Sequence, residues 1–312
     1  MINTVLGQKE KTDFGNVLMH EHIRVASNDL INTFGSRWLD DKKLIDYSAK
    51  ILIELRDKYN IGLWVDATPI DTGRNTRVLK AVSEKSGVDI VASTGLYYFP
   101  DLFTCERSDE DIAKWFIYEY ENGMEGTGIK PGILKCAVDR GGITQDMKKR
   151  ISALGITQRE TGLPLYAHCM HDGNSANELL DILLEISNEP HKIILGHTAN
   201  RPDAEYLESI LDRGCYICMD QCHCADFAIE DICKTLVKLC DNGYRDKILL
   251  SNDLCIYNDF AVKSGMDLSI DNQTARFGHI FEVVYKGFCE AGGSDADWNI
   301  MMNENSIDVL DT

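Results

Sequence analysis

Two histidines near the start of the chain, His20 and His22, lie within the apolar run 17–23 and have side chains that could do chemistry. Residues two apart in a β-strand project to the same face, so both imidazoles are expected to point to one side. Neutral imidazole is a good ligand for zinc and similar divalent ions. The pair alone is equally typical of two core or surface histidines, so its interpretation depends on the rest of the chain.

Four further polar residues lie within or at the end of later apolar runs: Lys135, His168, His197 and Asp253. Lys135 is unusual, because a buried ammonium group is costly unless it is paired or neutralised, and burial lowers its pKa. A neutral amine can react with carbon dioxide to give a carbamate, an anion whose oxygens can bridge a pair of metal ions. A lone lysine in a strand is more often a snorkelling or salt-bridged residue. Its place between histidine-bearing runs favours a metal ligand here.

Apolar runs of strand length alternate along the chain with amphipathic segments of helical period. The expected strands are 17–23, 61–67, 89–96, 132–138, 163–168, 192–197, 214–220 and 247–253. The expected helices are 43–59, 76–86, 109–122, 144–161, 174–187, 203–212, 229–241 and 274–291. Eight such units predict an α/β fold, a (β/α)8 TIM barrel, with residues 1–312 as a single domain. A doubly wound open sheet is the alternative, but no Gly-x-Gly follows the first strand.

Active-site residues of such barrels lie at the C-terminal ends of the strands. His20 and His22 belong to the first expected strand and Lys135 to the fourth, while His168, His197 and Asp253 close the fifth, sixth and eighth. Chance could supply one or two such residues. All six together indicate a metal site.

The composition limits the classes of partner and the compartment. The chain of 312 residues carries 32 basic and 50 acidic side chains, a net charge of −18, which argues against nucleic acid or an anionic membrane as partner. A small-molecule substrate is therefore the expected partner. Residues 1–15 have no apolar core of a signal peptide, and no run approaches the ~18 apolar residues of a membrane span. With no secretion signal, the eleven cysteines indicate reduced thiols and a cytoplasmic location.

A dense group of soft ligands lies around the seventh expected strand and comprises Cys215, Cys218, Cys222, His223 and Cys224. A structural zinc site is conceivable there, but the spacing lacks the paired Cys-x2-Cys of zinc ribbons and fingers, which favours non-ligand roles. His171 follows His168 by three residues and is expected to contact substrate or solvent rather than metal.

An ordered set of short motifs carries a family resemblance. The motifs are His20-Glu21-His22, Gly132-Ile133-Leu134-Lys135, Tyr166-Ala167-His168, Gly196-His197 and Ser251-Asn252-Asp253. In this order the sequence resembles the phosphotriesterase-related, lactonase-containing branch of the amidohydrolase superfamily, from about Thr4 to Leu310. Each motif alone is weak, whereas the ordered set is specific. The resemblance implies a TIM barrel of the metallo-dependent hydrolase type.

The resemblance also implies roles for the six residues. His20, His22 and Asp253 would hold the more buried of two divalent metal ions, and His168 and His197 the more exposed one. Carboxylated Lys135 would bridge the two ions together with a hydroxide, which attacks the substrate, and Asp253 would be the catalytic proton acceptor. Zinc is the first expectation for the metal, with manganese, iron or cobalt as alternatives.

The expected substrate rests on the same resemblance and on nearby side chains. Tyr97 and Tyr98 match an aromatic position typical of lactonases, although either ring could instead pack at the barrel rim. Arg24 and Arg276 are candidate phosphate partners, since guanidinium groups bind phosphate in a bidentate manner, or they are surface ion pairs. The loop 220–226 and the segment 303–306 depart from the family pattern, and the first departure leaves substrate specificity open.

The leading hypothesis is therefore a hydrolase that opens a sugar lactone or phosphorylated sugar lactone. A phosphotriesterase or N-acyl-homoserine lactonase on the same metals is the alternative within the enzymes. A non-catalytic metal-binding barrel is the alternative of another class, and a proton-transfer role for Asp253 argues against it. The family suggests a homodimer.

Overall fold

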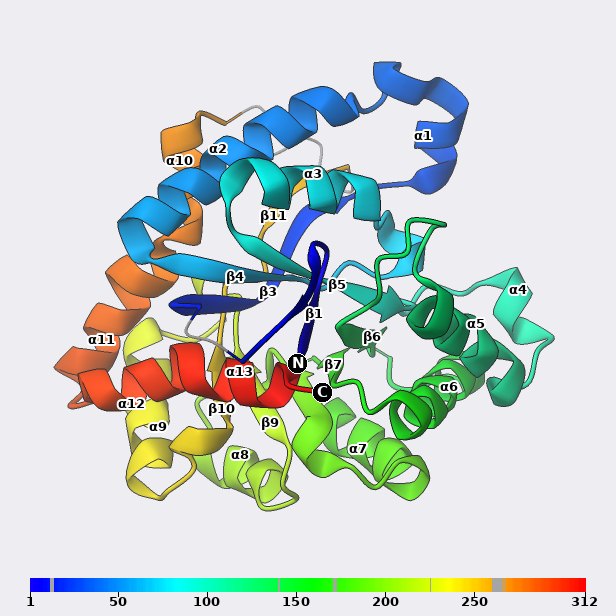
Figure 1. Cartoon of the computed structure of the whole chain (residues 1–312). Helices are drawn as coiled ribbons and strands as arrows, with labels where there is room; N and C mark the ends of the chain where they lie inside the picture. The colour runs from blue at the N-terminus through cyan, green and yellow to red at the C-terminus, as the bar shows by residue number, and fades with distance from the viewer. Residues whose placement is uncertain (12–13, 140, 171–172, 225, 260–265, 267) are drawn as a thin grey trace.

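The computed structural model describes residues 1–11, 14–139, 141–170, 173–224, 226–259, 266 and 268–312. Its main sheet is a ring of parallel strands surrounded by helices (Figure 1). In spatial order the strands are β10 (Ile248–Leu250), β9 (Tyr216–Met219), β8 (Ile193–Gly196), β7 (Leu165–His168), β6 (Ile133–Ala137), β5 (Asp89–Gly95), β4 (Ile61–Asp66), β3 (Asn16–Val25) and β11 (Cys255–Asn258). The predicted (β/α)8 barrel is confirmed.

The eighth strand of the barrel is split, which corrects the expected strand 247–253. β10 ends at Leu250 and pairs with β9, whereas β11 begins at Cys255 and pairs with β3. The break 251–254 joins the two halves and is itself bonded to β3. Asp253 N donates to His20 O at 2.9 Å, and His22 N donates to Leu254 O at 2.9 Å. The barrel therefore closes through the break that carries Asp253.

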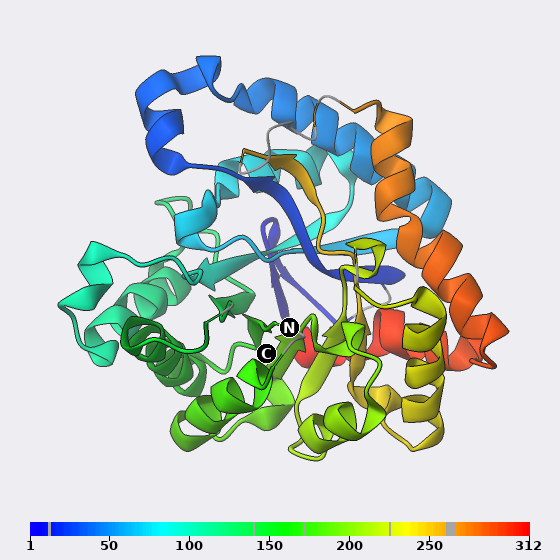
Figure 2. The same cartoon turned by 180° about the vertical axis from the view of Figure 1, so that it is seen from behind.

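Helices cover the outside of the barrel (Figure 2). The main ones are α2 (Asp41–Tyr59), α3 (Thr76–Ser86), α5 (Asp109–Asn122), α6 (Gln145–Thr161), α7 (Ser175–Ile186), α8 (Ala204–Leu211) and α9 (Ile229–Asp241). Their starts follow from local chemistry. Asp40, Asn75 and Ser108 accept hydrogen bonds from the first free N–H groups of α2, α3 and α5. The bounds predicted for most of these helices agree with the structure to within a few residues.

The expected helix 274–291 is wrong as a single element. Here α10 (Ile270–Phe277) ends before Gly278, the π-helical turn η8 (Ile280–Val284) follows, and α11 (Tyr285–Glu290) completes the segment. The chain then ends in α12 (Asp295–Asn299), η9 (Ile300–Glu304) and α13 (Asn305–Leu310). Short helices α1 (Asn28–Phe34) and α4 (Leu102–Cys105) were not predicted either, because they are too short to show a helical period.

One end of the barrel is covered by an N-terminal hairpin of β1 (Ile2–Thr4) and β2 (Gly7–Lys9), with α13 beside it (Figure 1). The Met1 amino group forms an ion pair with Asp311, so the two termini lie together. Within the described residues, no helix has the length and apolar character needed to cross a membrane.

The core has two parts. A large apolar cluster between the barrel and the helices includes Leu18, Trp64 and Leu134. A smaller one takes side chains from successive strands, among them Val17 and Met19, and fills the barrel interior. The opposite end of the barrel, at the C-terminal ends of the strands, is left for polar side chains.

Candidate metal centre

An irregularity in β3 turns both histidines toward the barrel axis. Met19 points inward and Leu18 outward, so strict alternation would turn His20 outward. Between Leu18 and Glu21 the register with β4 shifts, because three steps along β3 match two along β4. Such a bulge reverses the phase of the side chains that follow it. His20 and His22 therefore share one face as predicted, and the bulge makes it the inner face.

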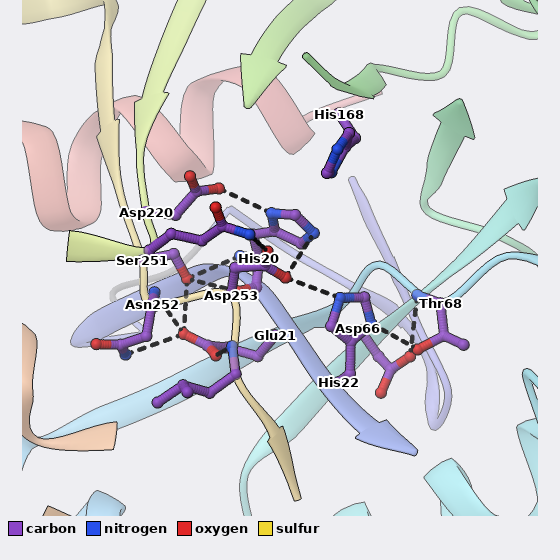
Figure 3. A network of polar contacts seen from close by, with 12 residues as sticks. His20, Glu21, His22, Asp66, Thr68, His168, Asp220, Ser251, Asn252 and Asp253 are labelled. Atoms are coloured by element: carbon purple, nitrogen blue, oxygen red, sulfur yellow. Dashed lines mark hydrogen bonds and ion pairs between the residues drawn. The ribbon is translucent and has the colours of Figure 1, made fainter. Parts of the chain in front are cut away.

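The six residues expected at the strand ends converge in the structure, and Figure 3 shows His20, His22, His168 and Asp253 among them. Lys135 Nζ lies 2.8 Å from His20 Nε2. Asp253 Oδ1 lies 3.1 Å from His22 Nε2 and 3.3 Å from His20 Nε2. On the other side of the site His168 Nδ1 lies 2.7 Å from His197 Nε2. Asp253 Oδ2 lies 3.7 Å from His197 Nε2, so Asp253 stands between the two histidine groups.

The convergent atoms suit divalent metal ions. One oxygen of Asp253 and one ring nitrogen from each of His20 and His22 all lie within 4.8 Å of one another. A zinc ion bound to nitrogen and oxygen at ~2.0–2.2 Å needs ligand atoms about this close together. Imidazole and carboxylate are also the ligand types that zinc, manganese, iron and cobalt accept. The residues therefore fit the expected metal ions, and their assignment as ligands stays a prediction.

Asp220, which was not among the predicted site residues, holds two of the histidines. It accepts from His20 Nδ1 at 2.8 Å and from His197 Nδ1 at 2.5 Å, and its side chain is fully buried. With Nδ1 engaged in this way, the Nε2 atom of each ring is directed toward the centre of the site. Metal-bound histidines commonly have such a carboxylate partner. The available signal was its position, because Asp220 closes the seventh expected strand as His197 closes the sixth.

Tyr166 supports this arrangement from inside the barrel. Its hydroxyl donates to Asp220 Oδ2 at 2.5 Å, and Lys135 Nζ lies 4.5 Å from the centre of its ring. The ring passes directly over Gly196, where a Cβ atom would lie 2.5 Å from Tyr166 Cε1. Glycine before His197 is therefore required for Tyr166 to reach Asp220.

Burial sets the protonation of these groups. It lowers the pKa of His20 to about 3 and that of His168 well below the usual range, so both rings are neutral and able to bind a metal. Burial also lowers the pKa of Lys135, against the charges of Asp253 and Asp220. For Asp253, burial is outweighed by the neighbouring histidines, and its pKa stays well below the usual range.

Asp253 has an unusual backbone and an amide partner. Its φ of 54° is in the left-handed region, which costs a non-glycine residue about 1 kcal/mol or more. Gln221, with a φ of 57°, donates from Nε2 to Asp253 Oδ2 at 2.5 Å. Its backbone N–H also donates to Asn252 O at 2.9 Å. Gln221 was not among the residues predicted from the sequence.

A cavity of about 500 Å³ opens over the site. Its described lining includes His20, His22, His168 and Asp253 from the site, and Val25, Pro69, Thr72, Tyr97, Tyr98, Phe99, Gln221, Cys255 and Asn258 around it. The Tyr97 hydroxyl lies 3.3 Å from His168 Nδ1, and burial raises the pKa of Tyr97 well above its usual range. Tyr97 and Tyr98 thus both border the cavity, and only Tyr97 has a hydroxyl contact with a predicted ligand among the hydrogen bonds described.

Arg24 and Arg276 are not brought to this cavity. Arg24 Nε donates to Gly73 O at 2.5 Å, and its Nη1 lies 3.3 Å from Asp41 Oδ1. Arg276 donates to Gln273 at 2.8 Å. The structure gives no support to either as a phosphate partner.

The cysteine group does not form a metal site within the described residues. Cys218 points into the barrel core and Cys215 Sγ lies 3.3 Å from Ile210 O, while Cys224 is exposed. No cysteine belongs to the groups of side chains there that could hold a metal ion. His171 lies outside the described residues.

Comparison with known proteins shows the family of the chain. The sequence model of the Phosphotriesterase family matches residues 1–310. The chain is 32% identical over 254 residues to a protein of Saccharolobus solfataricus named Aryldialkylphosphatase, covering 80% of each. It is 27% identical to a Phosphotriesterase homology protein of Mycobacterium tuberculosis, over 97% of this chain and 95% of the relative. An N-acetyltaurine hydrolase of Mus musculus is 24% identical over 81% of this chain and 84% of its own.

A solved structure extends the comparison to the fold. The structure of the phosphotriesterase from Mycobacterium tuberculosis superposes with a TM-score of 0.90 and 26% identity, covering 99% of this chain and 98% of that one. The chain belongs to the phosphotriesterase family. The predicted family and the predicted enzyme class, a hydrolase, are confirmed.

Proposed function

We propose that this chain is a binuclear metal-dependent hydrolase that opens an uncharged lactone, such as an unphosphorylated sugar lactone. The observation that carries the proposal is the convergence of His20, His22, Lys135, His168, His197 and Asp253 beneath one cavity. Two divalent ions bound there would polarise the scissile bond and supply a nucleophile derived from water at neutral pH.

The side chains of the chain account for the remaining steps. Asp253 Oδ2 is the proposed proton acceptor, because it lies at the edge of the cavity and is held ionised by the neighbouring histidines. Gln221 donates to the same oxygen and so fixes its direction. The Tyr97 hydroxyl is the proposed hydrogen-bond donor to the substrate oxygen that becomes negative, because it borders the cavity beside His168.

Lys135 is the proposed site of carboxylation. Its burial and lowered pKa favour the neutral amine, the form that reacts with carbon dioxide. The resulting carbamate would be an anionic ligand beside Asp253, in a proposed set whose other four members are the imidazoles of His20, His22, His168 and His197. Zinc is the proposed metal, with manganese, iron and cobalt as alternatives.

The cavity supports an uncharged substrate. Its walls carry Tyr97, Tyr98 and Phe99, and no arginine or lysine is among the described residues that line it. The phosphate of a phosphorylated lactone would find no arginine or lysine among the described residues that line the cavity. We therefore favour a lactone without phosphate. The same uncharged walls, with the relative named Aryldialkylphosphatase, favour a phosphotriester as the second candidate.

A substrate panel tests the proposal. Unphosphorylated lactones, their phosphorylated counterparts, a phosphotriester and an N-acetyl amide would be assayed with metal-loaded protein and with metal-stripped protein as control. The account predicts the highest kcat/KM for an uncharged lactone, with loss of turnover on metal removal. Turnover that is unchanged after complete removal of metal would contradict it.

The single domain, the cytoplasmic location and the homodimer remain predictions.

A further inference from the structure

Glu21, the residue between the two histidines of β3, points away from the site and is completely buried. Its carboxylate contacts four donors of the barrel break. Oε1 lies 2.8 Å from Ser251 Oγ, 2.8 Å from Asn252 N and 3.0 Å from Asn252 Nδ2, and Oε2 lies 2.9 Å from Leu254 N. The two oxygens of Glu21 are the acceptors for these donors, whose hydrogen bonds act against the burial that raises the pKa of Glu21 to about 8.

These donors flank Asp253 on both sides. Asn252 precedes it and Leu254 follows it, and between them Asp253 adopts its left-handed φ of 54°. Such a conformation persists only where the surroundings enforce it. The break belongs to neither β10 nor β11, and beside its backbone bonds to the neighbouring strands the hydrogen bonds to Glu21 hold it on both sides of Asp253.

We propose that Glu21 is a positioning residue that locks the break 251–254 and so holds Asp253 against His20 and His22 for metal binding. The two faces of β3 then act together, since the histidines face the metal site while Glu21 holds the third ligand in place from the outer face. This inference rests on the proposed function, because it takes Asp253 as a ligand.

The geometry makes Glu21→Gln a sharp variant. With the amide oxygen at the position of Oε1, three donors are kept, but the amide NH2 then faces the N–H of Leu254. The reverse orientation sets the NH2 against three donors. Either way at least one bond is replaced by a contact between two donors, whereas the side chain keeps its size.

The matched control is Glu119→Gln. Glu119 on α5 accepts from Arg74 through both oxygens, at 2.6 and 2.8 Å, away from the metal site. Wild type, Glu21→Gln, Asn252→Ala and Glu119→Gln would be stripped of metal. Zinc affinity would then be measured by titration, zinc content by elemental analysis, and the stability of the metal-free form by thermal unfolding. Asn252→Ala removes only one donor to Glu21, so the test survives if Glu21→Gln does not fold.

A side chain bonded directly to a metal ligand commonly contributes ~10–100-fold in metal affinity, and Glu21, which acts through the residues on both sides of Asp253, is expected at the lower end of that range. We expect Glu21→Gln to lower zinc affinity by about tenfold or more, Asn252→Ala to lower it less, and Glu119→Gln to leave it unchanged while lowering the unfolding temperature. Excess zinc should restore turnover of Glu21→Gln. Equal zinc affinity in Glu21→Gln and wild type would overturn the inference, as would a loss of affinity in Glu119→Gln of the same size. A wild type that binds no metal would instead overturn the proposed function.

Discussion

Gln221 and Asp253 come from the ends of neighbouring strands, and both have left-handed backbones, with φ of 57° and 54°. The side-chain amide of Gln221 donates to the carboxylate of Asp253. A side-chain amide does not ionise near neutral pH, so this donor is present at every pH at which the enzyme is folded. The Oδ2 atom of Asp253 therefore has the same hydrogen-bond donor, Gln221 Nε2, over that whole pH range.

Replacing Gln221 with alanine should lower kcat/KM even when excess metal keeps the site loaded. A hydrogen bond to a charged group is worth about 1.5–3 kcal/mol, so a fall of about tenfold or more is expected. Gln221→Glu should be worse, because its carboxylate would repel Asp253. Steady-state kinetics with parallel metal analysis checks both, with the exposed Gln145→Ala as control. Full activity in Gln221→Ala would show that Asp253 needs no such partner.

Asp220→Asn should weaken metal binding at both histidine groups. An amide oxygen can accept from His20 or His197, but its NH2 would then face the other ring. Loss of such a partner commonly costs ~10–100-fold in metal affinity. Zinc titration of the metal-free variant is the measurement. Affinity within twofold of wild type would contradict the role given to Asp220.

Tyr97→Phe removes a hydroxyl and keeps the aromatic wall. If the hydroxyl stabilises the developing oxyanion, kcat on a lactone should fall by about tenfold or more, while KM and metal content change little. Tyr98→Phe is the matched control on the neighbouring ring. A rise in KM with unchanged kcat would assign Tyr97 to substrate binding alone.

Asp71 gives a pH dependence of stability. Burial raises its pKa to about 6, against the hydrogen bonds from Tyr97 N at 2.9 and 3.0 Å, whereas the unfolded chain has the ordinary value of ~3.9. The folded state therefore keeps a proton between about pH 4 and 6 that the unfolded chain has lost. The contribution of Asp71 to the free energy of unfolding thus falls as pH rises through this window.

Asp71→Asn should remove this slope, since an amide does not titrate. Thermal unfolding of wild type and variant from pH 4 to 7 checks it, with the expectation that the stability of the variant relative to wild type rises between pH 4 and 6. Parallel profiles of the two proteins would show that Asp71 does not titrate in this window.

The sequence was sufficient for the barrel and for the set of candidate ligands, because apolar runs and strand-end positions are local signals. His168 and His197 were predicted from their position at the ends of two strands, and in the structure His168 Nδ1 lies 2.7 Å from His197 Nε2. The bulge before His20 was not predictable, because it appears only as a register shift against β4. The split of the eighth strand was missed for a related reason, because the second half appears only through the pairing of 255–258 with β3, although the apolar run already ends at Leu250.

The partners of the ligands were harder to predict than the ligands. Asp220, Glu21 and Gln221 act through contacts with residues 23 or more positions away, as in the bond from His197 to Asp220. Arg24, a predicted phosphate partner, is not among the described residues that line the cavity, and the converse reason applies. It lies on β3 near the histidines, yet its side chain turns to Gly73 and Asp41 rather than to the cavity.

The central claim is that the six convergent residues hold two divalent metal ions. Elemental analysis of protein purified without chelators tests it most directly, beside a Lys135→Ala variant and native mass measurement of Lys135 for the added mass of one carbon dioxide. The account predicts two metal ions per chain in wild type, carboxylation of Lys135, and fewer ions in the variant. A wild type that holds no metal, and regains none when zinc and bicarbonate are supplied, would contradict it.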